Sequence, residues 1–212
     1  MTHEESLTYC SLQNVEKSFA KSGVSIGPVS LDIKRGEVVG IRGINGAGKS
    51  TLFRMIAGIL KPDKGNIIYN PEVEKHIAYV PQELSLYEAL SCKDNLIFWG
   101  SVAGLNKEQV MIRSEWLMKE LNLTFWSDQQ VSECSGGTKR RLHLATALMR
   151  LPKVLLLDEP SVGADDESAG LILHNIMHLK SLGISTLIIS HRKGELEQIC
   201  DRILTLHEGH LT

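Results

Sequence analysis

A glycine-rich stretch that ends in Lys and Ser has the most definite chemistry in this sequence. It reads Gly43-Ile44-Asn45-Gly46-Ala47-Gly48-Lys49-Ser50, and Thr51 follows it. Glycines let successive backbone N–H groups point at a phosphate, and a helix that begins there adds the positive end of its dipole. In such a loop Lys49 binds the β- and γ-phosphates of a nucleotide, and the Ser50 hydroxyl is a ligand for Mg²⁺. The stretch therefore predicts a phosphate-binding loop.

Two adjacent carboxylates follow a run of large aliphatic residues. The run 154–157 has the pattern of a buried strand and leads directly into Asp158, Glu159 and Pro160. A strand end beside the phosphate loop places Asp158 near Mg²⁺, through a water, and Glu159 near the γ-phosphate. Glu159 is then the candidate general base for an attacking water. The alternative is a solvated Asp-Glu turn before Pro160.

A second anion-binding pattern lies between these two motifs. Ser135, Gly136 and Gly137 open a helical run that extends to about residue 150. A serine hydroxyl and free backbone N–H groups at a helix N-terminus form an anion site. The chain is thus expected to carry two separate phosphate-binding ends.

The order of hydrophobic patterns describes the elements that position these motifs. Strands are expected at 7–15, 29–33, 38–42, 66–69, 76–80, 153–157, 185–189 and 202–206, and helices at 50–58, 166–181 and 194–200. Between about 92 and 133 the pattern is helical throughout. Strands that alternate with helices predict an α/β fold with a mostly parallel sheet.

Composition excludes several classes of protein. The 212 residues include 25 acidic and 23 basic ones, so the net charge of −2 provides no cationic field for nucleic acid. The four cysteines are widely separated in sequence and lack the spacing of a zinc site or a redox pair, which indicates reduced, cytosolic thiols. The first six residues are polar, without a signal peptide pattern, and no apolar run approaches the roughly 18 residues of a membrane span.

Together, in this order, the segments resemble the nucleotide-binding subunit of an ATP-binding cassette (ABC) transporter, over nearly the whole chain. The phrase from Leu86 to Ser91 and the run Lys139-Arg140-Arg141 resemble the exporter-like, ABC-2-type subset. The resemblance implies a P-loop NTPase core with an N-terminal antiparallel β subdomain. It also implies one domain over 1–212, with a helical subdomain inserted at about 84–150.

The resemblance implies ATP and Mg²⁺ as cofactors and adds residues to the site. Gln82 matches the glutamine loop that reaches Mg²⁺ and the water, and His191 matches the switch histidine at the γ-phosphate. Phe19 aligns with the aromatic residue that stacks on adenine, although it could instead belong to the core. The implied nucleotide contacts are Phe19, Gly43, Asn45, Gly46, Ala47, Gly48, Lys49, Ser50, Thr51, Ser135, Gly136 and Gly137, with Ser50, Gln82 and Asp158 at the metal.

In the resembled family the signature helix of one subunit covers the ATP of another, so Ser135 to Gly137 are expected to act in trans in a dimer. Asp165 matches the loop between the two sites, but it could equally cap the helix that follows. Cys134 and Thr138 stand where Leu and Gln are commonest, which leaves the Ser-Gly-Gly core intact. The run 139–141 is expected to be a solvated helix face.

The implied function is an ATPase subunit, bound to the cytoplasmic face of a membrane, that powers export through a separate polytopic permease. Its dimer partner would be a second copy or a related ABC subunit. Leu84, Leu86, Tyr87 and Leu90 are expected to face the permease. Two alternatives stay open: a soluble ABC ATPase that acts on ribosomes, DNA or assembly, and a nucleotide kinase, which would leave the Ser-Gly-Gly motif without a task.

Overall fold

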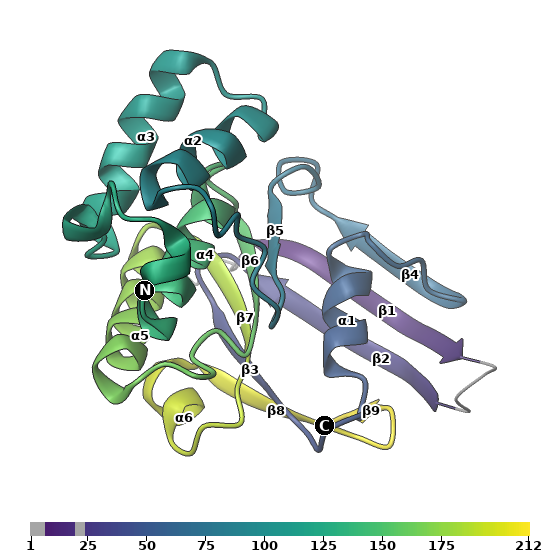
Figure 1. Cartoon of the computed structure of the whole chain (residues 1–212). Coiled ribbons are helices and arrows are strands. Elements are labelled where there is room, and N and C mark those ends of the chain that lie inside the picture. The colour runs from purple at the N-terminus through teal and green to yellow at the C-terminus, as the bar shows by residue number, and fades with distance from the viewer. Residues whose placement is uncertain (1–6, 20–23) are drawn as a thin grey trace, which may run out of the picture.

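A computed structural model describes residues 7–19 and 24–212, and the polar N-terminal segment 1–6 lies outside the described residues. Figure 1 shows two sheets with helices around them. The smaller sheet is antiparallel and has the order β2-β1-β4, built from β1 (Thr8–Phe19), β2 (Val24–Lys34) and β4 (Lys64–Tyr69). β1 buries Cys10 and Leu12 in one apolar core, and a register shift between Leu12 and Val15 brings Val15 into the same core.

The larger sheet is mostly parallel and has the order β5-β6-β7-β3-β8-β9. Its strands are β3 (Val38–Arg42), β5 (Ile77–Val80), β6 (Val154–Asp158), β7 (Ser185–Ile189), β8 (Arg202–His207) and β9 (His210–Leu211). Ile189 pairs with both Ile41 of β3 and Asp158 of β6, so these three strands end side by side. The loops that follow β3, β6 and β7 therefore meet at one edge, where ligands bind in open α/β sheets.

The helices cover both faces of this sheet. α1 (Lys49–Ile56) lies toward the antiparallel sheet, whereas α2 (Cys92–Val102), α3 (Lys107–Glu120) and α4 (Gly136–Leu148) form a group on the other side (Figure 1). Short turns η1 (Thr124–Trp126) and η2 (Val131–Glu133) connect α3 to α4, and α5 (Asp166–Ser181) and α6 (Glu195–Ile199) follow β6 and β7.

The central strands separate two apolar cores. Leu156, Leu187 and Ile189 face a core that includes Phe53 of α1, while Leu155, Leu157 and Ile188 face a core with α4 and α5. Burial on both faces explains why these strands read as continuous aliphatic runs. The same two cores fix α1 and α4 on opposite sides of the sheet edge.

The α/β fold predicted from the sequence is confirmed, with small differences at the ends of elements. α5 and β7 match their predicted ranges, but β1 extends to Phe19 and β2 already begins at Val24. α1 ends at Ile56 because Gly58, with φ 71°, leaves the helical region. None of the helices in the described part of the chain has both the length and the apolar composition needed to span a bilayer.

Two cysteines that are distant in sequence are neighbours in the helical region. The Sγ atoms of Cys92 and Cys134 are 3.7 Å apart and both residues are buried, as free thiols. Burial raises the pKa of Cys92 to about 12, and the contact with Cys134 adds to the shift. Because the thiolate is the reactive form, this pair packs as apolar side chains.

Candidate functional site

The loop between β3 and α1 has the backbone conformation of a phosphate cradle. Gly46 and Gly48 have φ of 83° and 99°, and Gly48 is the N-cap of α1 without a capping side chain. A Cβ atom on Gly43 would lie 2.3 Å from the carbonyl oxygen of Leu206, and one on Gly48 would lie 2.4 Å from the Ile26 side chain. Glycine is therefore required at both positions, and the first N–H groups of α1 remain available to an anion.

Lys49 places a cation inside this loop. The residue is 7% exposed, and its Nζ donates to the carbonyl oxygens of Gly43 and Ile44 at 2.8 and 3.0 Å. Burial lowers the pKa of Lys49, and the nearby carboxylates of Glu159 and Asp158 oppose that shift. The ammonium group is thus held by the loop itself, in the position from which it can bind phosphate oxygens.

A cavity of about 690 Å³ opens between this loop and the ends of β6 and β7. Most of the predicted site residues line it: Phe19, Asn45, Gly46, Gly48, Lys49, Ser50, Thr51, Gln82, Asp158, Glu159 and His191. Gly43 and Ala47 shape the loop without lining the cavity, and Val162 and Ile189 line it without having been predicted. Its volume lies in the range of small-molecule sites, from roughly 300 to 1,000 Å³.

Phe19 lies at this cavity rather than in the core. It is partly exposed and belongs to neither apolar core of the described residues. This position is compatible with stacking on a base in the cavity, and the adenine contact stays a prediction.

Asp158 is fixed at the end of β6 by a residue that the sequence did not single out. It is 3% exposed, and the hydroxyl of Tyr79 in β5 donates to its Oδ2 at 3.1 Å. Burial, together with Asp158, raises the pKa of Tyr79, so the phenol keeps its proton and remains a donor. Tyr79 was missed because its partner comes from a distant segment, β6.

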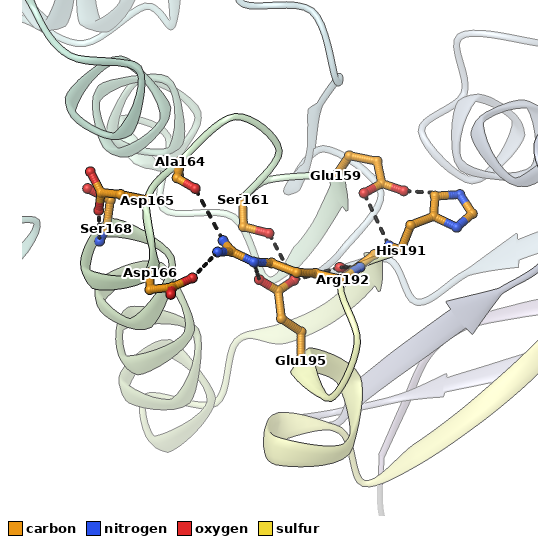
Figure 2. A network of polar contacts seen from close by, with 10 residues as sticks. Glu159, Ser161, Ala164, Asp165, Asp166, Ser168, His191, Arg192 and Glu195 are labelled. Carbon is orange, nitrogen blue, oxygen red and sulfur yellow. Dashed lines mark hydrogen bonds and ion pairs between the residues drawn. The ribbon is translucent and has the colours of Figure 1, made fainter.

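Glu159 has a strained backbone and a partly unsatisfied carboxylate. Its φ is 53°, a left-handed conformation that L-residues seldom adopt, and its N–H donates to the carbonyl of Ile189 at 3.0 Å. The backbone N–H of His191 donates to Oε2 at 3.3 Å, as Figure 2 shows. Nε2 of His191 lies 3.3 Å from Oε1, but without hydrogen-bond geometry, so within the described chain Oε1 is buried without a donor.

Burial raises the pKa of the Glu159 carboxyl; Asp158 adds to that shift, while His191 and Lys49 oppose it. A raised pKa and an acceptor oxygen without a protein donor are properties that suit a general base.

The oxygen donors at the cavity fit a magnesium ion that is shared with phosphates. Ser50, Gln82 and Asp158 all line it, and these are hard oxygen ligands. No cluster of three or more His, Cys, Asp or Glu residues suited to a metal occurs in the described segments. Mg²⁺ commonly takes few protein ligands and completes its shell with phosphate oxygens and water.

The Ser-Gly-Gly motif lies apart from this cavity. Ser135 is the N-cap of α4, where its Oγ accepts from the Thr138 N–H at 3.2 Å and lies 2.9 Å from the Thr138 hydroxyl. Ser135 and Gly136 are exposed, and the motif is absent from the lining of the Lys49 cavity in the described chain. A Cβ atom on Gly137 would lie 2.1 Å from Ser168 Oγ, so this end of α4 packs on the start of α5.

Asp165 caps the helix that follows it. Its carboxylate accepts from the Ser168 N–H at 2.7 Å, and the Ser168 N–H and hydroxyl hold the pKa of Asp165 below its ordinary value. Figure 2 shows this cap beside the loop 161–166. The helix-cap alternative is thus confirmed, and a second role between two nucleotide sites stays a prediction.

The prediction of a solvated face at residues 139–141 is wrong. Lys139 pairs with Glu88 at 3.1 Å, and Arg140 donates to the carbonyls of Gln82 and Val162 at 2.5 and 3.0 Å. Arg141 is 7% exposed and donates to the carbonyls of residues 121 and 122. Carbonyl groups at loop and helix ends need donors, and the arginine forks of α4 supply them.

Comparison with known proteins gives one consistent result. A family model described as ABC transporter matches residues 26–162. The chain is 36% identical over 207 residues to the linearmycin resistance ATP-binding protein LnrL of Bacillus subtilis (strain 168), covering 94% of this chain and 66% of the relative. It is 37% identical over 210 residues to the lipopolysaccharide export system ATP-binding protein LptB of Escherichia coli (strain K12), covering 94% of this chain and 87% of the relative.

The chain belongs to the ABC transporter family. It is thus an ABC ATPase, a cassette that binds ATP and serves transporters. Solved structures agree: cbiO1 of Clostridium perfringens, part of an ABC transporter complex, superposes with a TM-score of 0.87 at 28% identity, covering 97% of this chain and 88% of that one. A cassette in its ADP conformation superposes with a TM-score of 0.83 at 25% identity, covering 97% and 90%.

Proposed function

We propose that this ABC ATPase hydrolyses MgATP in the cavity between the phosphate loop and the ends of β6 and β7. The observation that carries the proposal is the Glu159 carboxylate, which shares the cavity with Lys49 and His191 and accepts from the His191 N–H. A base that is buried, short of a donor and next to a phosphate cradle is suited to orient a water against a γ-phosphate.

Each predicted residue has a task in this reaction. Backbone N–H groups of the phosphate loop and of the first turn of α1, together with Lys49, bind the β- and γ-phosphates. Ser50, Gln82 and Asp158 hold Mg²⁺, which would neutralise charge on the phosphates. Glu159 takes a proton from the water, and His191 donates a hydrogen bond to the γ-phosphate and orients the attack. Phe19 stacks on the adenine.

The cassette is proposed to work as a head-to-tail dimer. Ser135 and Gly136 are exposed at the N-terminus of α4, Gly137 is buried behind them, and none of the three lines the cavity of the described chain. A nucleotide in one subunit would then be covered by this end of α4 from the other, a second copy or a related ABC chain. Such a geometry gives both phosphate-binding ends a ligand.

A polytopic permease is the proposed partner, at the cytoplasmic face of a membrane, and export is the proposed direction. Leu84 and Tyr87 expose apolar surface just after Gln82, with 37% and 47% exposure, whereas Leu86 packs against the core and Leu90 is half-buried. The ring of Tyr87 packs edge-on against the ring of Phe98, with ring centroids 4.5 Å apart. Export is favoured because one relative is named for lipopolysaccharide export.

A pull-down from the native membrane separates this function from the soluble alternative. A tag on this chain is used to isolate its complex in mild detergent, and mass spectrometry identifies the proteins present in stoichiometric amount. A polytopic membrane protein is expected. Ribosomal or other soluble partners, with no membrane protein, would overturn the transport proposal and favour a soluble ABC ATPase.

The same experiment tests the proposed contact surface. Tyr87→Ser should lower the yield of the co-purified permease, while ATP binding, measured separately, stays unchanged. Phe125→Ser is the matched control, because Phe125 is an aromatic residue with 86% exposure on another part of the helical region. An equal loss with both variants would contradict a specific role for Tyr87.

A further inference from the structure

Glu195 is a buried carboxylate that the reaction described above does not use. It lies in the first turn of α6 and is 4% exposed. Its Oε2 accepts from the hydroxyl of Ser161 at 2.8 Å, as Figure 2 shows, and from the hydroxyl of Ser190 at 2.5 Å. Both serines are also buried. One carboxylate oxygen therefore joins two serines from different loops.

These serines flank the two residues proposed to act on the attacking water. Ser161 is two residues after Glu159, in the turn closed by the hydrogen bond from the Val162 N–H to the Glu159 carbonyl at 3.2 Å. Ser190 directly precedes His191, whose N–H donates to the Glu159 carboxylate. Glu159, Ser161, Glu195, Ser190 and His191 thus form a closed ring of covalent and hydrogen-bonded links.

Arg192 extends this ring to the segment that packs near the Ser-Gly-Gly motif. Its backbone N–H donates to Ser190 Oγ at 3.1 Å, and its guanidinium donates to the carbonyl of Ala164 at 3.3 Å and to the carboxylate of Asp166. Nε of Arg192 lies 3.9 Å from Oε1 of Glu195, which is buried and has no hydrogen bond within the described chain.

We propose that Glu195 is a positioning residue for ATP hydrolysis, which holds the Glu159 and His191 loops in one geometry. The inference rests on the proposed roles of those two residues. Glu159 keeps a left-handed backbone, and such a conformation persists only where its surroundings fix it. The hydrogen bond from Ser161 to Glu195 fixes the turn that follows Glu159. The hydrogen bond from Ser190 to Glu195 fixes the start of the next loop, where the His191 N–H orients the Glu159 carboxylate. Hydrogen bonds to a charged acceptor are about twice as strong as neutral ones.

The expected effect is on turnover and not on nucleotide affinity. Glu195→Ala should lower kcat by about 10- to 100-fold, the scale of an active-site misplacement near 1 Å. The Kd for MgATP should change less than about twofold, because the phosphate loop is untouched. Glu195→Gln keeps an oxygen acceptor and should recover most of kcat. This second variant keeps the proposal testable if Glu195→Ala folds poorly.

A double-mutant cycle distinguishes positioning from plain stability. Ser161→Ala and Ser190→Ala each open the ring once, so the double variant should have nearly the kcat of the slower single variant. Neither serine change should lower kcat further in the Glu195→Ala background. If the effects on ln kcat add, or if kcat follows thermal stability across the set, the positioning role is refuted.

Two controls distinguish the role of Glu195 from the proposed role of Glu159 as general base. Glu37→Ala removes a carboxylate that Arg202 Nε contacts at 2.6 Å, beyond the opposite end of β3, and should keep kcat. Glu159→Gln tests the base itself: wild-type turnover in that variant would overturn the proposed base. If Glu159→Gln is inactive but the effects of Ser161→Ala and Ser190→Ala on ln kcat add, only the Glu195 role is overturned.

Discussion

His191 and Glu159 are joined across the ends of two parallel strands. The His191 N–H donates to Oε2 of Glu159 at 3.3 Å, and its Nε2 lies 3.3 Å from Oε1. Because β6 and β7 pair in register up to Asp158 and Ile189, the residues that follow each strand must lie side by side. The pairing of strands thus sets the distance between the proposed base and its neighbour.

Glu159→Gln is expected to keep ATP binding and to lose about 10²- to 10⁴-fold in hydrolysis, the usual contribution of a general base. The amide cannot take a proton from water, but it has nearly the same shape. Equilibrium binding of MgATP and steady-state phosphate release measure the two effects separately. Wild-type phosphate release would contradict the assignment.

The same variant should be more stable than the wild type at neutral pH. Burial raises the folded-state pKa of Glu159 above its ordinary 4.5, so the ionised carboxylate is unfavourable in the folded state. Between 4.5 and the raised pKa the folded protein binds more protons than the unfolded chain, so stability falls as pH rises through this window. The Tm of Glu159→Gln should exceed that of the wild type by its full amount above the raised pKa. The two proteins should have the same Tm below pH 4.5. A pH-independent gain would point to another cause.

The left-handed backbone at Glu159 gives a prediction about strain. With φ of 53°, alanine at this position keeps the strain, whereas glycine relieves it. The free energy of unfolding of Glu159→Gly should therefore exceed that of Glu159→Ala by about 0.5–1 kcal/mol, after the larger unfolded-chain entropy of glycine is subtracted. The glycine variant should accordingly have the higher urea midpoint. Urea titrations of both inactive variants measure the difference. Equal midpoints would mean that the turn relaxes when the carboxylate is gone.

The chemistry carried by short contiguous segments was predictable from the sequence. The loop 43–50 contains its own backbone donors, and the strand that ends at Asp158 is a single aliphatic run. The local structure of each motif can therefore be predicted from its own residues. The cavity then gathers Lys49, Asp158 and Glu159 because parallel strands end at one edge.

Contacts between distant segments were not predictable in the same way. Glu195 reads as an ordinary acidic residue in the first turn of a helix, and Arg140 as part of a charged surface. Their partners, Ser161, Gln82 and Val162, lie 22 or more residues away in the chain. Only the packing of α4 and α6 against the sheet edge brings these groups together.

The trans role of the Ser-Gly-Gly motif predicts a separation of ATP binding from dimer formation. Ser135→Arg adds a long cation at the exposed N-terminus of α4, away from the cavity of the same chain. ATP should still bind the monomer, but ATP-dependent dimers should not form in an Glu159→Gln background, where hydrolysis cannot release them. Light scattering with and without MgATP measures this, and dimers at wild-type level would refute the trans role.

Arg140 is expected to couple Gln82 to the loop after Glu159. Its guanidinium donates to the carbonyls of Gln82 and Val162 with two different nitrogens, a fork that lysine cannot reproduce. Arg140→Lys should therefore lower kcat by about tenfold, near the loss of one hydrogen bond from a charged donor. Lys139→Ala is the control, because its partner Glu88 is 65% exposed and such pairs contribute little. A larger effect from Lys139→Ala would place the coupling in the surface pair instead. If Arg140→Lys keeps full activity, the two carbonyls do not need a fork to hold the nucleotide loops in place.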